Sequence, residues 1–405
     1  MSDDAMLLDG LKVIDAASFI AGPVAATVLA DFGADVIKIE APGGDGYRNI
    51  VNNAGMPAER VNYAWQVDNR SKRGICLDLA AEEGQAILHQ LLAGADVLVT
   101  NFLPRVRDKL GLTADALLAR YPRLIYASMS AYGEVGPEAH KTGFDSTALW
   151  ARTGLMDLVK PEPDATPARS LPGMGDHPTG ISLLAAILLG LYKRERTGNG
   201  SHVSTSLVAN GIWMNAFYAQ AALNGAAIPP RPHRDAAPNP MTNHYQCKDS
   251  RWFILAAVNE EREATEVFKA IGREDLLADP RFADKPSRRA NAAALTKLLD
   301  ETFVARDWNE WREILGRHRI TFGPVGTLDD LAGDGTLRDA GALVPDGAGG
   351  LTVGSPVFMD GEAKRPPQAA PGIGAHSRDI LAELGYAESD IERLIAGGVV
   401  QCPSF

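Results

Sequence analysis

The chain has 405 residues, of which 45% are hydrophobic and 22% are charged, a balance typical of a soluble globular protein of two or three domains. Its formal net charge of -11 argues against nucleic acid as a main partner and against a polybasic membrane anchor. A phosphorylated small ligand is not excluded, because its site needs only a few local cations.

Three widely spaced cysteines, Cys76, Cys247 and Cys402, form no CxxC motif, so the sequence predicts neither a disulfide framework nor a zinc site. The eight histidines show no paired ligand spacing, and we expect no bound metal. The N-terminus MSDDAMLLDG is unlike a signal peptide, and the longest apolar run, around 181–192, is shorter than the roughly 20 residues that cross a bilayer. We therefore expect a cytoplasmic protein.

Strand and helix patterns alternate in the first third of the chain. Residues 11–18, 22–33 and 35–40 predict a strand, a helix and a second strand, which together form a parallel βαβ unit. The alternation continues with a helix at 82–95, a strand at 96–101, a helix at 113–121 and a strand at 124–133. This order predicts an α/β fold with helices on both faces of the sheet.

Ligands of such sheets bind in the crevice beyond the carboxyl ends of the strands. The sequence places these ends at four segments, SFIAGP, IEAPGGDGYR, TNFLP and SAYGEVGP, which begin at Ser18, Ile39, Thr100 and Ser130. We expect the binding site to be built from these segments.

The second half of the chain begins with a helix that follows Asp176 and is apolar nearly all round, so we expect it to be buried. Residues 201–211 predict a strand that leads into another helix. The proline-rich stretch 226–243 lacks periodicity and is interpreted as a linker. Beyond it, 244–322 predicts a smaller α+β domain with one strand and three amphipathic helices, and 323–405 is loop-rich with a helical tail.

The segment GMGDHPTG, residues 173–180, places the carboxylate of Asp176 among three glycines. Aspartate is among the best N-cap residues, and Pro178 before an apolar run is typical of a helix start, so the local sequence favours a helix cap. Alternatively, Asp176 is a nucleophile: the helix N-terminus keeps it ionised, and the glycines leave room for a substrate carbonyl. The two interpretations are compatible.

Two basic clusters stand out in this acidic chain, one in 67–79 and one in 101–111. Both lie close to predicted strand ends, where a phosphate-bearing ligand docks, but a solvated surface is an equally open interpretation. Their cations are Arg70, Lys72, Arg73, Arg105, Arg107 and Lys109. The chain contains no GxGxxG in its first turn, no GxxxxGK[ST] and no GxSxG, so dehydrogenase, P-loop and α/β-hydrolase functions are disfavoured.

Several segments in register closely resemble the class III coenzyme A transferases, the family of formyl-CoA transferase, crotonobetainyl-CoA transferase and the α-methylacyl-CoA racemases. The resemblance is carried by LDGLKVIDAASFIAGPVAATVLADFGADVIKIEAPGGD, DNRSKRGICLDL, ADVLVTNF, GMGDHPTG and KRERTGNGSHV. It runs almost unbroken over 8–215 and continues more weakly through 279–289, 322–331 and 371–381.

The resemblance implies a large domain with a Rossmann-like parallel sheet, built from 1–225 and completed by the return segment 323–405. A small domain at 244–322 lies between two linkers. Family members form homodimers of interlinked ring-like subunits, and the resemblance implies the same for this chain.

Asp176 aligns with the catalytic aspartate of the family. The coenzyme A contacts that carry over are Ile20, Ala21, Leu77, Asn101, Phe102, Lys109, Ser130 and Tyr132. Lys109 stands where relatives often carry arginine, so it would hold a phosphate as a point charge rather than a fork.

The implied reaction transfers coenzyme A from an acyl-CoA to a carboxylic acid, through an anhydride and a thioester on Asp176. It needs no metal and no permanently bound cofactor, since acyl-CoA and coenzyme A are substrates. Two alternatives remain: an α-methylacyl-CoA racemase, and a protein that binds coenzyme A esters without turnover. Hydrolysis of the acyl-CoA is a further possibility if water reaches the anhydride.

Departures from the family patterns favour transfer of a bulky acid. The racemase branch carries a catalytic histidine where this chain has Phe144, and His140 reaches the site only if its loop rearranges. The racemases also carry a glutamate where this chain has Asn259. The glycine-rich loop of formyl-CoA transferase is absent from 256–264, which disfavours oxalate and formate. Phe144, Trp150 and Tyr132 are candidates for lining an acyl pocket.

Overall fold

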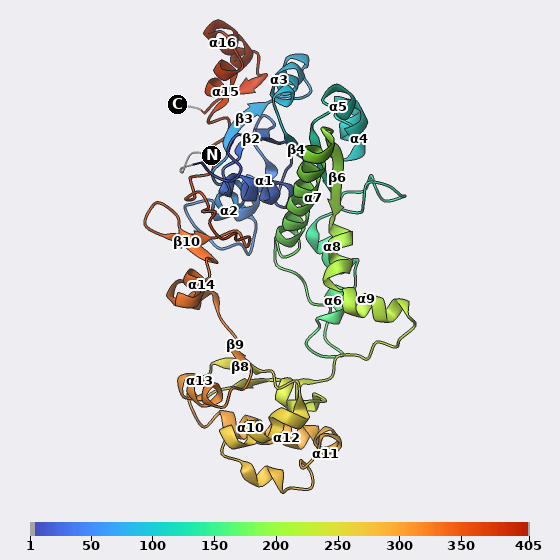
Figure 1. The fold of residues 1–405 in the computed structure, drawn as a ribbon, viewed down its shortest axis with the longest axis vertical. Helices are drawn as coiled ribbons and strands as arrows, with labels where there is room; N and C mark the ends of the chain where they lie inside the picture. Colours follow the sequence, from blue (N-terminus) through green and yellow to red (C-terminus); the bar gives the residue numbers. More distant parts are fainter. Residues whose placement is uncertain (1–4, 404–405) are drawn as a thin grey trace. The chain divides into compact units, whose positions relative to one another are not determined.

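A computed structural model describes residues 5–403, which divide into two compact units (Figure 1). The large unit contains the chain up to residue 156 together with 169–226 and 336 onward. The small unit contains 157–168 and 227–335. The sequence did not indicate that 157–168 would group with the small unit.

A seven-stranded sheet forms the centre of the large unit, in the order β12-β3-β2-β1-β4-β5-β6. Its strands are β1 (Lys12–Asp15), β2 (Asp35–Glu40), β3 (Arg73–Leu77), β4 (Val97–Thr100), β5 (Ile125–Ser130), β6 (Ser201–Ser206) and β12 (Val400–Gln401). All neighbours pair in parallel except β12, which joins β3 antiparallel at the edge. The predicted Rossmann-like α/β sheet is therefore confirmed, and the strand order reverses direction between β1 and β4.

Helices cover both faces of this sheet. The helices that lie in the large unit, wholly or in part, are α1 (Ala21–Asp31), η1 (Gly46–Asn52), α2 (Tyr63–Asn69), α3 (Glu82–Ala93), α4 (Pro104–Leu110), α5 (Ala114–Arg120), η2 (Asp145–Ala151), α6 (Leu155–Leu158), α7 (Asp176–Thr197), α8 (Leu207–Met214), α9 (Ala216–Leu223), α14 (Gly335–Asp339), α15 (Ser377–Glu383) and α16 (Glu388–Ala396). A short hairpin of β10 (Leu343–Pro345) and β11 (Leu351–Val353) completes the unit.

Alternate residues of each strand enter two separate cores. In β1, Val13 packs with α1 and α7 on one face, whereas Ile14 packs with α3, α15 and α16 on the other. In β4, Val99 and Leu98 divide in the same way. Burial on both faces explains why the strands read as continuous apolar runs, and it leaves the carboxyl ends of the strands for a site.

Helix α7 is not buried all round, and that prediction is wrong. One stripe, including Leu183, Leu184 and Ile187, enters the core next to α1. The opposite stripe exposes Leu189 and Tyr192 within this single chain. No described helix combines the length and hydropathy that crossing a bilayer requires.

The small unit packs helices against a three-stranded antiparallel sheet in the order β7-β8-β9. Its elements are η3 (Arg234–Ala236), η4 (Pro240–Thr242), β7 (His244–Gln246), β8 (Trp252–Leu255), α10 (Glu260–Ala270), η5 (Glu274–Leu277), α11 (Lys285–Ala290), α12 (Ala292–Phe303), α13 (Trp308–Arg317), β9 (Phe322–Pro324) and η6 (Leu328–Gly333). An aromatic core of Phe253, Phe303, Trp308 and Trp311 holds it together. The predicted α+β character is confirmed.

Candidate active site

A cavity of about 480 Å³ lies in the large unit at the carboxyl ends of β1 and β4. This is the point where the strand order reverses, and it is where open α/β sheets bind ligands. The lining comes from the segments that follow β1, β2 and β4, from the start of η2 and from the start of α7. Its residues include Ser18, Ile20, Ala21, Gly46, Asn49, Asn101, Phe144, Asp145, Arg169, Gly173 and Asp176.

Asp176 is the first residue of α7, and Gly175 occupies the N-cap position. Because Gly175 and not Asp176 is the N-cap residue, the interpretation of Asp176 as the helix cap is wrong. Its carboxylate lies in the cavity wall, partly exposed, and accepts no hydrogen bond from the described residues. A carboxylate at this position is free to meet a ligand.

The pKa of the Asp176 carboxyl is raised to about 7. Burial is the main cause, and the negative charges of Asp145 and Asp68 act in the same direction. The neighbouring His177 partly counters them and lowers the pKa. Near neutral pH, both the ionised and the protonated form of this carboxyl are therefore populated.

The glycines around Asp176 make room for protein atoms. A Cβ at Gly180 would come within 2.8 Å of the Ala21 carbonyl oxygen, so this glycine lets α7 approach α1. A Cβ at Gly175 would come within 2.9 Å of the Asp145 side chain. The expectation that these two glycines clear space for the substrate is therefore corrected, and only Gly173 lines the cavity.

The loop after β1 is fixed by side chains from two other strand ends. Phe19 has a φ of 64°, which is uncommon for a residue other than glycine. Its backbone N–H donates to the Asp45 carboxylate at 3.2 Å. The Asn101 amide donates to the Ser18 carbonyl at 2.7 Å, and Asn101 Oδ1 accepts from the Ser18 N–H at 2.9 Å. These contacts hold the start of α1 against the cavity.

Buried charges lie beneath this loop. Lys72 Nζ and Asp15 Oδ2 are 2.9 Å apart, and both side chains are inaccessible to solvent. Lys38 pairs with Asp15 at 3.8 Å and with Asp45 at 3.4 Å, and it also donates to the Ala17 carbonyl. Burial lowers the pKa of Lys72 to about 8, although Asp15 opposes that shift. These paired lysines and aspartates, together with the contact to the Ala17 carbonyl, anchor the loop after β1.

Beside Asp176, the imidazole of His177 is hydrogen-bonded at both nitrogens. Nε2 lies 3.0 Å from Asp68 Oδ1, and Nδ1 lies 2.9 Å from the Gly173 carbonyl oxygen. Asp68 is buried, and its second oxygen accepts from the Tyr47 hydroxyl at 2.6 Å. Burial lowers the pKa of His177, but the hydrogen bond and charge of Asp68 outweigh it and raise that pKa to about 9.

A second cavity of about 290 Å³ adjoins the first, since both are lined by Ser18 and Gly46. Its wall contains Leu77 and Phe102. The structure thus brings Ile20, Ala21 and Asn101 to the cavity of Asp176, and Leu77 and Phe102 to its neighbour.

Three of the residues expected to contact coenzyme A, Ser130, Tyr132 and Lys109, line neither cavity. The hydroxyl of Ser130 accepts from the Gly133 N–H at 3.1 Å, and Lys141 lies over the ring of Tyr132 at 4.9 Å. Lys109 is exposed on α4. Their roles stay predictions.

Most cations of the two basic clusters form ion pairs within the protein. Arg70 binds Asp31, Lys72 binds Asp15, Arg73 binds Asp35 and Glu383, and Arg107 binds Glu134. Ligand contact is thus disfavoured for these four. Arg105 and Lys109 are exposed and form no ion pair with the described residues, so they are the cations of the cluster that remain open to a phosphate.

Of the three aromatic residues expected to line an acyl pocket, Phe144 alone does so. Its ring is 56% exposed and meets Phe19 edge-on, with the centroids 5.4 Å apart. Trp150 is buried in the core instead, and Tyr132 lies outside the cavity lining. His140 is exposed and also outside the lining.

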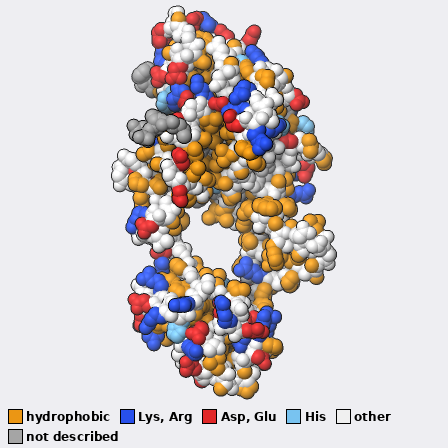
Figure 2. Space-filling view, in the orientation of Figure 1, with side chains coloured by type: hydrophobic (Ala, Val, Ile, Leu, Met, Phe, Trp, Pro, Cys, Tyr) orange, Lys and Arg blue, Asp and Glu red, His pale blue; other side chains and the backbone are white. Residues whose placement is uncertain are grey.

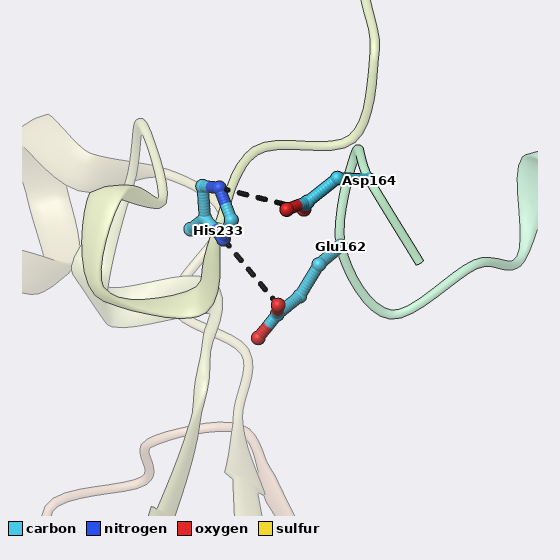
Figure 3. Close-up of side chains that lie close together, drawn as sticks. All are labelled: Glu162, Asp164 and His233. Carbon is cyan, nitrogen blue, oxygen red and sulfur yellow. Dashed lines mark ion pairs between the residues drawn. The ribbon is translucent and has the colours of Figure 1, made fainter. Parts of the chain in front are cut away.

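One group of possible metal ligands was found among the described residues, in the small unit (Figure 3). His233 Nδ1 lies 3.6 Å from Glu162 and His233 Nε2 lies 3.9 Å from Asp164. All three side chains are exposed. These contacts are those of a surface ion-pair cluster, and we assign no metal to it.

The fold is that of an α/β protein with a cavity at the strand switch point, where open sheets of this kind bind ligands. A family model described as CoA-transferase family III matches residues 8–377, and the chain belongs to that family. The protein is a CoA-transferase. The expected membership of the class III coenzyme A transferases is therefore confirmed.

Named relatives and a solved structure agree with this assignment. The chain is 34% identical to (R)-2-hydroxy-4-methylpentanoate CoA-transferase of Clostridioides difficile, over 98% of this chain and 100% of that protein. It is 33% identical to cinnamoyl-CoA:phenyllactate CoA-transferase of Clostridium sporogenes, over 97% of each chain. A crystal structure of a CAIB/BAIF family protein from Brucella suis superimposes with a TM-score of 0.83 at 32% identity, covering 94% of this chain and 100% of the other.

Sequence reasoning missed Tyr47, Asp68 and the pairing of His177. Their partners are far apart in the chain, since 109 positions separate Asp68 from His177. The available signal was indirect: Tyr47 lies in a segment expected to follow a strand end, and His177 lies inside the glycine-rich segment itself.

Proposed function

We propose that the protein transfers coenzyme A from an acyl-CoA to a carboxylic acid, with Asp176 as the nucleophile. The observation that carries this proposal is the Asp176 carboxylate in the cavity wall, without a hydrogen-bond donor from the described residues. The N-cap position is taken by Gly175, so Asp176 is not used to cap the helix.

The reaction begins when a carboxylate oxygen of Asp176 attacks the thioester carbon, breaks the C–S bond and releases coenzyme A thiolate. A mixed anhydride remains. The thiolate attacks the side-chain carbonyl carbon of Asp176, which frees the donor acid and leaves an aspartyl-CoA thioester. The acceptor carboxylate then attacks that thioester and releases the thiolate again. Attack of the thiolate on the acceptor acyl carbon yields the new acyl-CoA and restores the Asp176 carboxylate.

Each of these steps develops negative charge on an oxygen. The first residue of α1, Ala21, lines the same cavity as Asp176. The N-terminus of a helix carries unpaired N–H groups and partial positive charge. Such groups stabilise an oxyanion without a metal, and the anchored loop at Phe19 keeps them in place. The absence of a metal and of a permanently bound cofactor stays a prediction.

The two adjoining cavities suit the two ends of an acyl-CoA. We place the thioester and acyl group in the cavity of Asp176, and the nucleotide end in the cavity lined by Leu77 and Phe102. Arg105 and Lys109, on the helix that follows β4, are the cations available for the phosphates.

A bulky apolar acid is the substrate class that the cavity favours. The edge-on pair of Phe19 and Phe144 supplies an apolar wall, and Arg169 supplies a positive charge for a carboxylate. The substrates named for the two relatives, 2-hydroxy-4-methylpentanoate and phenyllactate, are 2-hydroxy acids with a branched or aromatic group. We therefore propose a 2-hydroxy acid of this type as acceptor or donor.

We also propose that the protein is a homodimer. The surface of the large unit carries hydrophobic side chains that a soluble chain normally buries (Figure 2). Those of α7, α8 and α9 are Leu188, Leu189, Tyr192, Ile212, Trp213, Met214, Phe217, Tyr218 and Leu223. Light scattering should give twice the mass of 43.2 kDa. Phe217→Asp should shift the mass toward one chain, and a monomeric wild type would refute the dimer.

Racemisation is disfavoured by the site. Exchange of a proton at the α-carbon needs two bases that face each other across the substrate. Phe144, which stands in the sequence where the racemase branch carries its histidine, lies in the cavity wall. Both nitrogens of His177 are engaged by other groups. Binding without turnover is disfavoured by the free carboxylate of Asp176.

Incubation with a panel of acids tests the proposed function. The enzyme is mixed with 4-methylpentanoyl-CoA or cinnamoyl-CoA and with phenyllactate, 2-hydroxy-4-methylpentanoate, succinate or formate, and the products are read by mass spectrometry. We expect transfer to the first two acids to exceed transfer to the last two, and Phe144→Ala to reduce that preference. Exchange of the α-proton without movement of coenzyme A would refute the proposal.

A further inference from the structure

The imidazole of His177 is held in a way that fixes its charge. Its Nδ1 contacts the Gly173 carbonyl oxygen at 2.9 Å, and its Nε2 contacts Asp68 Oδ1 at 3.0 Å. A carbonyl oxygen only accepts a hydrogen bond, and so does a carboxylate. Both ring nitrogens must therefore carry a hydrogen, which makes the ring an imidazolium cation.

Asp68 is equipped to hold that cation. Its carboxylate is buried, and its second oxygen accepts from the Tyr47 hydroxyl at 2.6 Å. Burial raises the pKa of Tyr47, and the negative charge of Asp68 raises it further, so the hydroxyl keeps its proton and donates. The ion pair of Asp68 and His177 thus links α2 to the first turn of α7.

Asp176 lies next to this cation in a setting that otherwise opposes its ionisation. The charged groups that act on its carboxyl are Asp145 from η2, Asp68 from α2 and His177 from α7. Two of the three are negative, and burial adds to their effect. His177 is the group that favours the carboxylate.

We propose that His177 is a positioning residue: its imidazolium, held by Asp68 and the Gly173 carbonyl, keeps the adjacent Asp176 in the ionised form that attacks the thioester. This inference rests on the proposed role of Asp176 as nucleophile. His177 acts through Asp176 and lies outside the described cavity lining. The backbone contact to Gly173 also fixes the turn that carries the nucleophile.

His177→Gln separates the charge from the contact, because the Gln amide still donates to Asp68 but carries no charge. The side chain of His177 is 46% exposed, so we expect an effect at the lower end of the range for a neighbouring charge, about one pH unit. The acidic inflection of kcat/KM should rise by that amount. The matched control is His233→Gln, which removes an exposed histidine paired with carboxylates in the small unit, and its inflection should equal that of the wild type.

A purely structural role gives another result. If His177 only held the turn, His177→Gln would lower kcat at every pH and leave the inflection in place, and that result would overturn the proposal.

A spectroscopic measurement tests the same coupling without any activity. In the full-length protein labelled with ¹⁵N-histidine, we expect both ring nitrogens of His177 to be protonated at pH 8. Their signals are assigned by their absence from His177→Gln or His177→Asn. Coupling between two titrating groups is reciprocal, so Asp176→Asn should lower the pKa of His177 by about the amount by which His177→Gln raises the inflection. A neutral His177 at pH 7, or a His177 pKa that Asp176→Asn leaves unchanged, contradicts the proposal.

Activity that survives Asp176→Ala instead refutes the proposed function. The NMR result does not depend on activity, so the two failures are distinguishable.

Discussion

The carboxylate of Asp145 accepts a hydrogen bond from the backbone N–H of Gly175 at 3.1 Å, one residue before Asp176. Asp145 therefore holds the turn that carries Asp176, the proposed nucleophile, and also raises the pKa of its carboxyl through its own negative charge. Asp145→Asn keeps an acceptor oxygen but removes the charge. We expect the acidic inflection of kcat/KM to move to lower pH, opposite to the effect of His177→Gln, because the pKa of Asp176 falls.

Asp145→Ala serves as the comparison, since it removes the acceptor as well as the charge. We expect kcat of this variant to fall across the whole pH range, because the turn loses its anchor. An inflection that stays in place in Asp145→Asn would show that Asp145 does not act on Asp176 through its charge.

The wild-type enzyme should lose activity in acid. In the proposed reaction the carboxylate of Asp176 attacks the thioester, and the pKa of this carboxyl is raised to about 7. Below that pH, kcat/KM should fall about tenfold for each unit, because the protonated acid is no nucleophile. Initial rates between pH 5 and 9 at low acyl-CoA concentration measure the profile. A flat profile down to pH 5 would contradict the raised pKa.

Arg105 and Lys109 should affect the binding of coenzyme A phosphates. Both are exposed and without ion pairs among the described residues, whereas Arg107 between them is buried against Glu134. We expect Arg105→Ala with Lys109→Ala to raise KM for acyl-CoA about tenfold, the loss of roughly one charge-assisted hydrogen bond, with kcat nearly unchanged. The control is the dephospho-CoA ester. If the two cations bind the 3′-phosphate, the variant should lose most of the preference for the acyl-CoA over its dephospho-CoA ester. If KM rises equally for both esters, the two cations do not bind the 3′-phosphate.

Neighbouring cations in the chain differ in what they contribute to stability. Lys72 is fully buried against Asp15, whereas Arg73 pairs at the surface with Asp35 and Glu383. Lys72→Met should lower the free energy of unfolding by about 3 kcal/mol, because Asp15 loses a buried partner. Arg73→Met should cost at most about 1 kcal/mol. Urea denaturation of the two variants measures the difference. Equal decreases in the free energy of unfolding would show that the buried pair stabilises the protein no more than the surface pairs do.

The sheet, its flanking helices and the location of the crevice could be predicted, because apolar periodicity is a local signal. Four strand ends were named from that pattern, and residues of three of them, those after β1, β2 and β4, line the cavity. The fourth, 130–137, contributes no residue to either cavity. The burial of α7 was overestimated, since periodicity does not reveal how much of an apolar helix one chain can cover.

Pairings across the fold could not be predicted. The basic cluster looked uniform in the sequence, yet Arg70, Lys72, Arg73 and Arg107 are engaged by acids from other elements. The imidazole of His177 likewise finds Asp68 across 109 positions. Such contacts depend on register and packing, which a single sequence does not specify.

The central claim is that Asp176 forms a covalent bond with the transferred group. The most direct measurement is mass spectrometry of the peptide that carries Asp176, after the enzyme is quenched during turnover of acyl-CoA. We predict an adduct of coenzyme A on that residue, which hydroxylamine converts to a hydroxamate, and a roughly 10⁴-fold loss of turnover in Asp176→Ala. Turnover that continues in Asp176→Ala, or that proceeds in the wild type with this peptide unmodified, would contradict the account.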